Sequence, residues 1–297
     1  MDLLSIDSLS DEQVGQILDE GDRWFDATRS GGTHDKRLSG KTAINLFYEN
    51  STRTLMSFAI AAQRLGAHPL NLPIEQSSVR KGETLEDTAR TLNAMHPDLL
   101  VIRHQRNGAP AIVADILECP VINAGDGTNQ HPTQALLDAA TIRRHFGRTE
   151  GLKVAICGDI KHSRVARSNM QLLPRLGCEV RLSGPPSLAP DGTRLLPIEE
   201  AIDGADVVMM LRVQRERLEE DLGDAPGEYL ARYGLTAGRM ERAAANAVVM
   251  HPGPINRGVE IEDAVADDPQ RSLITLQVEM GVAVRMACLD LLAGDRA

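Results

Sequence analysis

The stretch Asn45-Leu46-Phe47-Tyr48-Glu49-Asn50-Ser51-Thr52-Arg53-Thr54 joins an apolar strand to the start of a helix that is rich in hydroxyl groups. β-Branched and aromatic side chains predict a buried strand over residues 42–48. After it, apolar side chains recur at helical spacing at Met56, Phe58, Ile60, Ala61 and Leu65. The turn between strand and helix is therefore expected at Glu49-Asn50.

The predicted helix start is suited to binding a phosphate group. Ser51 or Thr52 can cap the helix, and several N–H groups of its first turn then have no partner within the helix. Hydroxyl groups and the Arg53 guanidinium add donors to these N–H groups and to the positive end of the helix dipole. The alternative is a well-capped helix with one surface arginine. Four donor-bearing residues in succession after a strand favour the phosphate site.

Composition excludes several classes of protein. The 297 residues are enough for two domains, and the 42 acidic against 32 basic residues argue against a duplex nucleic-acid binder and for small partners. Aromatic residues make up only 3%, so the stacking platforms of single-strand binders are missing. The four cysteines form no C-x-x-C pair, which predicts buried free thiols and no metal site.

The sequence also predicts the compartment. No apolar run is long enough to cross a bilayer. The N-terminus carries Asp2 and Asp7 and lacks the basic region of a secretory signal. We therefore expect a cytoplasmic protein.

Strands and helices alternate along the sequence, and this alternation predicts parallel sheets. Strands are expected over residues 42–48, 68–72, 99–103, 121–123, 153–157, 179–183, 206–211 and 247–250. We therefore expect an α/β fold with two doubly wound parallel-sheet domains, residues 1–147 and 148–275, and the active site in the cleft between them. The C-terminal helix, about residues 276–297, is expected to pack back on the first domain.

Polar residues recur just after the predicted strand ends, where open parallel sheets bind ligands. They are Thr54, Arg103, His131, Arg164, Arg212 and Pro252. Arg103 is interpreted either as a salt-bridged strand terminus or as a donor into the cleft. His131 opens a helix, where a neutral imidazole can donate to a developing oxyanion, and Gln134 shares its face. A lone histidine is more often structural, but the preceding Gly-Asp-Gly-Thr-Asn loop favours a functional role for His131.

The second half contains a candidate carboxylate site. The Gly158-Asp159 turn follows a strand, but a dinucleotide site is excluded because no G-x-G-x-x-G motif occurs there. Arg164, Arg212 and Gln214 would bind a dicarboxylate, since each guanidinium can donate two parallel hydrogen bonds to one carboxylate.

Two further loops are candidates for the site. His251-Pro252-Gly253-Pro254 predicts a rigid loop whose carbonyls face the cleft, and its alternative is a plain Pro-Gly turn. The polar loop from Ser77 to Gly82 either reaches a neighbouring subunit or is mobile.

These segments of the sequence resemble a known family, the transcarbamylases, and the resemblance covers nearly the whole chain. The resemblance lies in Ser51-Thr52-Arg53-Thr54, His131-Pro132-Thr133-Gln134 and His251-Pro252-Gly253-Pro254. Arg212-Val213-Gln214 and the loop from Ser77 to Lys81 are similar to its aspartate branch, and the Cys-Leu-Pro segment of the ornithine branch is absent. The resemblance implies carbamoyl transfer from carbamoyl phosphate to L-aspartate in pyrimidine biosynthesis, without a metal or cofactor.

The resemblance also implies a role for each matching residue. Phosphate binding falls to Ser51, Thr52, Arg53, Thr54 and Arg103, and binding of the carbamoyl group to Thr54, Arg103, His131 and Gln134. Aspartate binding falls to Arg164, Arg212 and Gln214, with main-chain contacts from Gly253 and Pro254. Ser77 and Lys81 are expected to enter the neighbouring subunit's site, where Lys81 also contacts aspartate, in a homotrimer.

The sequence departs from the family pattern at three positions, and two alternative functions have to be weighed. Leu55 and Ala59 stand where members often carry Arg and Glu, so local ion pairs of the family are not expected here. Gly253 replaces a bulkier residue, so the loop after residue 251 is expected to be less rigid. A transcarbamylase for another amine is disfavoured by the paired arginines. A non-catalytic scaffold for a partner enzyme is disfavoured by the joint presence of Arg103, His131 and Lys81. Trimers that work alone, bind regulatory chains or join a dihydroorotase are all compatible with the sequence.

Overall fold

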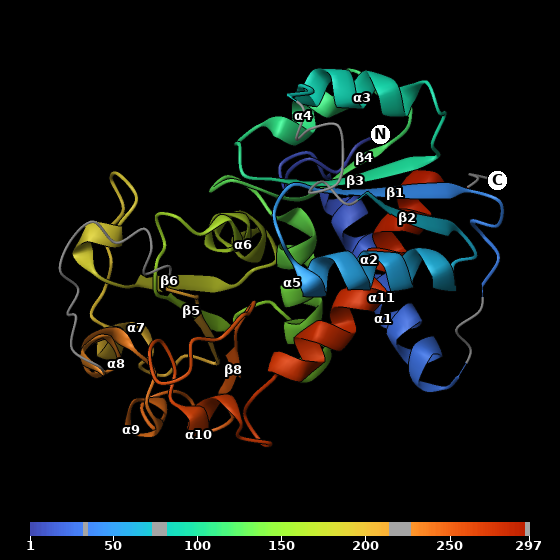
Figure 1. The fold of residues 1–297 in the computed structure, drawn as a ribbon. Helices are drawn as coiled ribbons and strands as arrows, with labels where there is room; N and C mark the ends of the chain where they lie inside the picture. Colours follow the sequence, from blue (N-terminus) through green and yellow to red (C-terminus); the bar gives the residue numbers. More distant parts are fainter. Residues whose placement is uncertain (32–34, 73–81, 214–226, 295–297) are drawn as a thin grey trace. The chain divides into compact units, whose positions relative to one another are not determined.

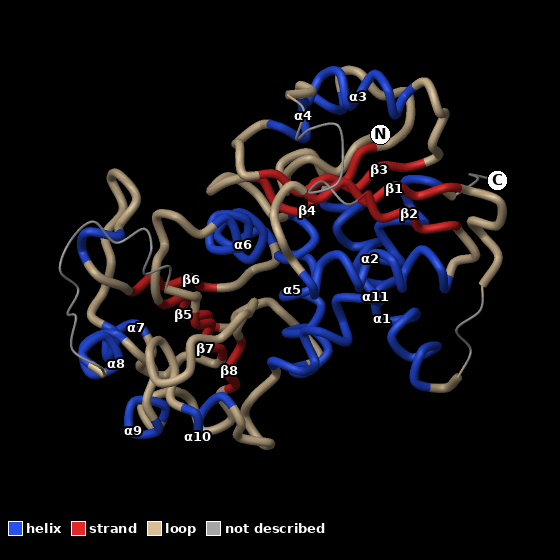
Figure 2. The backbone as a smooth tube through the Cα atoms, in the orientation of Figure 1, coloured by secondary structure: helices blue, strands red, loops and turns tan. Residues whose placement is uncertain are grey.

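The computed structural model describes residues 1–31, 35–72, 82–213 and 227–294. The chain forms two compact units, unit 1 from Met1–Ala140 with Val278–Ala297 and unit 2 from Thr141–Gln277. Each unit contains a four-stranded sheet whose strands are all parallel (Figures 1 and 2). The predicted α/β fold with two parallel-sheet domains is confirmed. Within the described ranges, no helix is long and apolar enough to span a membrane.

Unit 1 is built on a sheet with strand order β2-β1-β3-β4. Its strands are β1 (Thr42–Phe47), β2 (His68–Leu72), β3 (Leu99–His104) and β4 (Val121–Asp126). Its helices are α1 (Asp11–Arg29), α2 (Thr52–Arg64), α3 (Leu85–Asn93), α4 (Ala109–Ala114), the first part of α5 (Pro132–Phe146) and most of α11 (Ile274–Ala293). In Figure 1, α3 and α4 cover one face of this sheet, and α1, α2 and α11 lie on the other.

The burial of β1 and β3 in unit 1 explains why their sequences are continuous runs of mostly apolar residues. Four successive residues of β1 and four of β3 are buried, as expected for central strands of a parallel sheet that is covered on both faces. One core cluster joins Ile44 and Ile102 of the sheet to Ala89 of α3 and Val113 of α4. The opening helix α1 begins with the expected cap at Ser10, which forms a capping box with Gln13.

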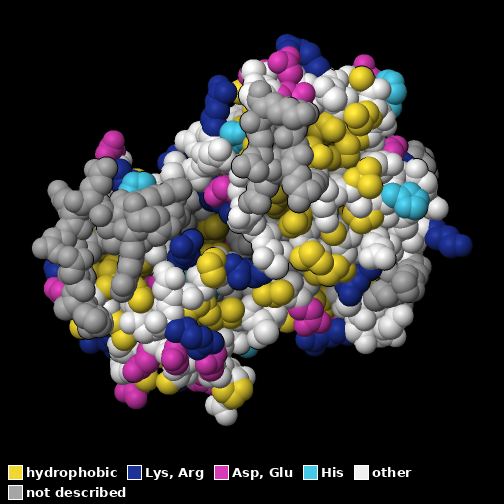
Figure 3. Space-filling view, viewed as in Figure 1, with side chains coloured by type: hydrophobic (Ala, Val, Ile, Leu, Met, Phe, Trp, Pro, Cys, Tyr) yellow, Lys and Arg dark blue, Asp and Glu magenta, His cyan; other side chains and the backbone are white. Residues whose placement is uncertain are grey.

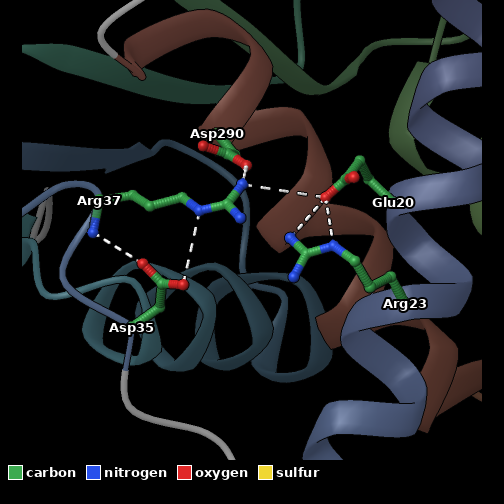
Figure 4. A network of polar contacts seen from close by, with 5 residues as sticks. All are labelled: Glu20, Arg23, Asp35, Arg37 and Asp290. Atoms are coloured by element: carbon green, nitrogen blue, oxygen red, sulfur yellow. Dashed lines mark hydrogen bonds and ion pairs between the residues drawn. The ribbon is translucent and has the colours of Figure 1, made fainter.

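The C-terminal helix α11 is tied to the opening helix and to the loop before β1. Gly21 of α1 lies so close to Val284 that an added Cβ would be 3.0 Å from its Cγ2 atom. At the surface, Arg37 contacts Asp290 at 2.5 Å, Asp35 at 3.5 Å and Glu20 at 3.9 Å, and Glu20 also contacts Arg23 (Figure 4). These exposed ion pairs add little stability individually, so the apolar contact carries more of this packing.

Unit 2 repeats the architecture with strand order β6-β5-β7-β8. Its strands are β5 (Lys153–Cys157), β6 (Glu179–Ser183), β7 (Val207–Met210) and β8 (Val248–Met250). Its helices include α6 (Arg164–Arg175), the 3-10 turn η3 (Pro186–Leu188), α7 (Ile198–Ala201), α8 (Glu228–Tyr233), α9 (Ala237–Met240) and α10 (Asp263–Ala266). Residues of α7, α9 and α10 pack on β5, β7 and β8 in one buried cluster.

Candidate active site

The start of α2 follows the end of β1 directly, as predicted. Ser51 occupies the N-cap position with an extended backbone, but its side chain accepts no hydrogen bond from the first turn of this described helix. Thr54 is buried, whereas Thr52 and Arg53 are exposed. The first-turn N–H groups are thus not satisfied by a side-chain cap, which argues against the alternative of a well-capped helix.

Arg53 is exposed as a residue, yet part of its side chain is surrounded by protein. This desolvation lowers the pKa of its guanidinium below the ordinary value. An anion bound at the helix start would reverse the shift, because a nearby negative charge favours the charged form. A bound anion would therefore stabilise the charged form of Arg53.

Arg103 is the penultimate residue of β3 and lies at the same end of the sheet, because the register pairs it with Phe47, the last residue of β1. Its Nη1 atom donates to the main-chain oxygen of Ala124 at 3.2 Å, and its Nε atom lies 3.8 Å from Glu49 Oε2. The side chain is only 13% exposed. The Arg103 side chain is thus anchored to the main chain of β4, with Glu49 beside it.

The loop before His131 is closed around one buried carboxylate that sequence reasoning missed. Asp126, at the end of β4, is 1% exposed. It accepts hydrogen bonds from Gly108 N (2.7 Å), Gln130 N (3.0 Å), Asn123 Nδ2 (2.8 Å) and Asn129 Nδ2 (3.0 Å). The entry to α5 is therefore fixed before substrate arrives, which is the preorganisation that an oxyanion donor needs.

His131 and Gln134 lie at the start of α5, and both are buried, at 3% and 8% exposure. Gln134 Nε2 donates to Asp138 Oδ1 at 3.0 Å, one turn further along the helix. Only the NH2 group of an amide can donate to a carboxylate, so this bond determines which way the Gln134 amide faces. Its carbonyl oxygen is consequently the end that can accept an N–H group from a ligand.

Asp138 acts electrostatically on a buried arginine, Arg285, that the sequence reasoning also missed. Arg285 of α11 donates through Nη1 to Gly281 O at 3.1 Å, and its Cζ atom lies 5.1 Å from the ring centre of Phe58. Burial lowers the pKa of Arg285 to about 10, while the negative charge of Asp138 acts in the opposite direction. The carboxylate that accepts from Gln134 thus also acts electrostatically on a buried arginine.

In unit 2 the two predicted arginines follow neighbouring strands. Arg164 is the first residue of α6, which is capped by Ser163 Oγ accepting from Ala166 N at 3.1 Å. Arg212 follows β7, and β5 and β7 are paired through Cys157 and Met210. The two arginines therefore belong to one sheet edge, and both are part-buried.

The first residue of the loop after β8 forms a hydrogen bond within that loop. His251 is buried, and its Nδ1 atom accepts a hydrogen bond from Gly253 N at 2.8 Å. Gly253 has a φ of 66°, a left-handed conformation that glycine adopts without steric cost. Glycine thus fits the backbone conformation that this loop adopts.

The other predictions stand as follows. Leu55 and Ala59 are part-buried on α2. Ser77, Lys81 and Gln214 lie outside the described residues. Residues 51–54, Arg103, His131 and Gln134 belong to unit 1. Arg164, Arg212, Gly253 and Pro254 belong to unit 2.

Family models and individual relatives match this chain over nearly its whole length. Residues 1–144 match the model of the aspartate/ornithine carbamoyltransferase carbamoyl-P binding domain, and residues 150–292 match that of the Asp/Orn binding domain. The aspartate carbamoyltransferase catalytic subunit of Rhizorhabdus wittichii is 57% identical, with 99% of this chain and 95% of the relative covered. That of Granulibacter bethesdensis is 56% identical, with the same coverage.

Solved structures show the same fold. Aspartate transcarbamoylase from Trypanosoma cruzi, in complex with N-(phosphonacetyl)-L-aspartic acid, has a TM-score of 0.88 at 32% identity, covering 97% of this chain and 94% of that one. Ornithine carbamoyltransferase from Pyrococcus furiosus has a TM-score of 0.89 at 29% identity, covering 100% and 98%. Both structures resemble this chain over nearly their full length.

Proposed function

The chain belongs to the aspartate/ornithine carbamoyltransferase family, and we propose that it transfers the carbamoyl group of carbamoyl phosphate to the amine of L-aspartate. The products are N-carbamoyl-L-aspartate and phosphate, and we place the reaction in pyrimidine biosynthesis. The fold alone does not select the acceptor amine, because an ornithine enzyme superposes as well as an aspartate enzyme. The choice of aspartate is supported by curated relatives at 54–57% identity, which are aspartate carbamoyltransferase catalytic subunits.

Carbamoyl phosphate is assigned to unit 1. The observation that carries this assignment is the start of α2, where Ser51 forms no side-chain cap and Arg103 lies at the end of the adjacent strand. The phosphate accepts hydrogen bonds from the first turn of α2 and from the side chains of Ser51, Thr52, Arg53, Thr54 and Arg103. Two of these, Thr54 and Arg103, also reach the carbamoyl group.

The reaction proceeds by direct attack. The aspartate amine attacks the carbamoyl carbon, a tetrahedral oxyanion forms, and phosphate leaves with the amine proton. His131, Thr54 and Arg103 donate to the developing oxyanion, and the Gln134 carbonyl accepts from the carbamoyl NH2 group. The protein contributes position and charge, so this chemistry requires neither a covalent intermediate nor a metal.

L-Aspartate is assigned to unit 2. Its two carboxylates pair with Arg164 and Arg212, and Gln214 and the main chain at Gly253 and Pro254 complete the pocket. A structure of the Trypanosoma cruzi enzyme in complex with carbamoyl phosphate and aspartate, 31% identical with a TM-score of 0.87, supports this pair of substrates.

The active form is assigned as a cytoplasmic homotrimer in which Ser77 and Lys81 of one subunit enter the neighbouring site and Lys81 also contacts aspartate. The support is an apolar surface on unit 1. Met56 on α2 is 49% exposed and Leu70 on the edge strand β2 is 54% exposed. Figure 3 shows hydrophobic side chains at the surface in this part of unit 1. Exposed apolar side chains on and beside an edge strand favour burial against another subunit.

A product assay tests the function. The purified chain is incubated with carbamoyl phosphate and either L-aspartate or L-ornithine. We expect carbamoyl-aspartate from the first mixture and no citrulline from the second. Citrulline formation would assign another acceptor, and the absence of both products would favour a non-catalytic scaffold.

A further inference from the structure

Unit 2 contains a buried polar network that the reaction scheme does not use. The side chains of His251 and Glu260 are both 0% exposed. Glu260 Oε1 accepts a hydrogen bond from Asn256 N at 2.6 Å and lies 3.2 Å from His251 Nε2. Burying a carboxylate is unfavourable unless its partners are retained, so an apolar residue would serve a purely space-filling role better.

The contacts of His251 define its tautomer. Its Nδ1 atom accepts the N–H of Gly253 at 2.8 Å, so in the neutral ring the proton is on Nε2. Nε2 therefore donates to Glu260 Oε1. One carboxylate oxygen thus receives donors from both ends of the loop that contains Gly253 and Pro254.

The network continues from this loop to the segment after β7. The Asn256 side chain donates through Nδ2 to the main-chain oxygen of Val213 at 3.0 Å. Val213 is the residue directly after Arg212 and is 1% exposed. Strands β7 and β8 are neighbours in the sheet, so the Asn256–Val213 bond joins the two loops that leave adjacent strand ends.

We propose that Glu260 and Asn256 are positioning residues for aspartate binding: Glu260 orients the loop after β8, and Asn256 uses that loop to fix the main chain beside Arg212. This inference rests on the proposed function, in which Arg212 binds an aspartate carboxylate. A fixed main chain limits the conformations from which the long arginine side chain must be selected, and affinity is gained by that preorganisation.

The most selective test is Asn256→Ala. It removes the bond to Val213 but keeps the main-chain N–H that donates to Glu260. We expect the KM for aspartate to rise roughly tenfold, the factor that one lost hydrogen bond of ordinary strength supports. The KM for carbamoyl phosphate should change little, and the thermal unfolding midpoint should fall by no more than a few degrees.

Arg257→Ala is the matched control in the same loop. Arg257 is the next residue, its side chain is 49% exposed, and it pairs with Asp263 and Asp267. Its removal breaks ion pairs without touching Val213, so the KM for aspartate should stay unchanged. An equal rise in both variants would reduce the effect of Asn256 to general loosening of the loop and overturn the inference.

Glu260 is tested by a conservative and a non-conservative variant. In Glu260→Gln the amide oxygen can still accept from Asn256 N and His251 Nε2, so most of the aspartate affinity should remain. Glu260→Ala removes the acceptor for both donors and should raise the KM for aspartate at least as much as Asn256→Ala. If Glu260→Ala does not fold, the KM for aspartate of Glu260→Gln is compared with that of Asn256→Ala, and this comparison tests the positioning role of Glu260. A larger loss of affinity in Glu260→Gln than in Asn256→Ala would contradict the proposal.

A double-variant cycle separates this inference from the proposed function. If Asn256 acts through Arg212, Asn256→Ala should have little further effect on aspartate affinity in an Arg212→Ala background. Additive losses would overturn the positioning role while leaving the function intact. If Arg212→Ala alone leaves aspartate affinity unchanged, the assigned role of Arg212 fails instead.

Discussion

The two units present their candidate site residues in different ways. In unit 1, Thr54, His131 and Gln134 are buried at the starts of the 13-residue helix α2 and the 15-residue helix α5. In unit 2, Arg164 likewise begins a helix, whereas Arg212 and Gly253 lie on two loops that the hydrogen bond from Asn256 to Val213 joins. We infer that substitutions in unit 1 change turnover or stability, whereas substitutions in unit 2 change mainly the affinity for aspartate.

The largest expected effect belongs to unit 1. His131→Ala should lower kcat by roughly 10²–10³-fold, as loss of one preorganised oxyanion donor does. The KM values should change less, because the interaction strengthens in the transition state. Steady-state kinetics with both substrates provides the measurement. Weaker substrate binding with unchanged kcat would show that His131 has no catalytic role. The proposed difference between unit 1 and unit 2 would then not hold for His131.

Asp138→Asn examines the residue that accepts the hydrogen bond from Gln134. The asparagine oxygen can still accept from Gln134 Nε2, but the charge that acts on buried Arg285 is lost. We expect the free energy of unfolding to fall by roughly 1 kcal/mol or more, because the buried Arg285 charge loses a favourable negative charge. Denaturant unfolding measures this loss, with activity followed in parallel. Unchanged stability would show that Asp138 and Arg285 are not energetically coupled.

Arg212→Ala tests whether substitutions in unit 2 change mainly the affinity for aspartate. The KM for aspartate should rise by roughly tenfold to a hundredfold, the range for a lost hydrogen bond to a charged group. The KM for carbamoyl phosphate should change little, since that substrate is assigned to unit 1. Separate titration of each substrate is the measurement. A similar loss for both substrates would contradict the division of labour between the units.

The sequence predicted unit 1 better than unit 2, for a physical reason. The strand before Ser51, the helix after it and the helix after His131 carry local signals in periodicity and turn chemistry. Helices α8 and α10, with six and four residues, are too short for a periodic pattern and were missed. The short strand expected at residues 121–123 extends to Asp126, because it pairs with β3 as far as His104.

Supporting residues were harder to predict than the residues they support. The spacing of Gln134 and Asp138 is that of neighbours on a helix face, so this pair was within reach of sequence reasoning. Arg285 and Glu260 were not, because α11 and the loop after β8 meet their partners only in the folded chain. An arginine or glutamate in a sequence is by default a surface residue.

The smallest effect concerns two helical glycines of unit 1, Gly15 and Gly281. An added Cβ at Gly15 meets nothing within 4 Å, so Gly15→Ala should raise the free energy of unfolding by about 1 kcal/mol through helix propensity. At Gly281 the same atom would lie 2.7 Å from Arg285 Nη1 and 3.3 Å from Leu137 Cδ2. The gain in propensity should there be cancelled or reversed.

The pair also tests whether Arg285 affects the site through Asp138. Displacing the Arg285 guanidinium in Gly281→Ala should disturb Asp138 and, through it, the Gln134 amide, so kcat should fall relative to Gly15→Ala. Both variants remove a glycine from a helix interior, so the unfolded-state effect of the substitution is shared and cancels in the comparison. Thermal unfolding and kcat are measured side by side. If Gly281→Ala is stabilised as much as Gly15→Ala and retains full turnover, Arg285 moves without consequence, and the support for Gln134 ends at Asp138.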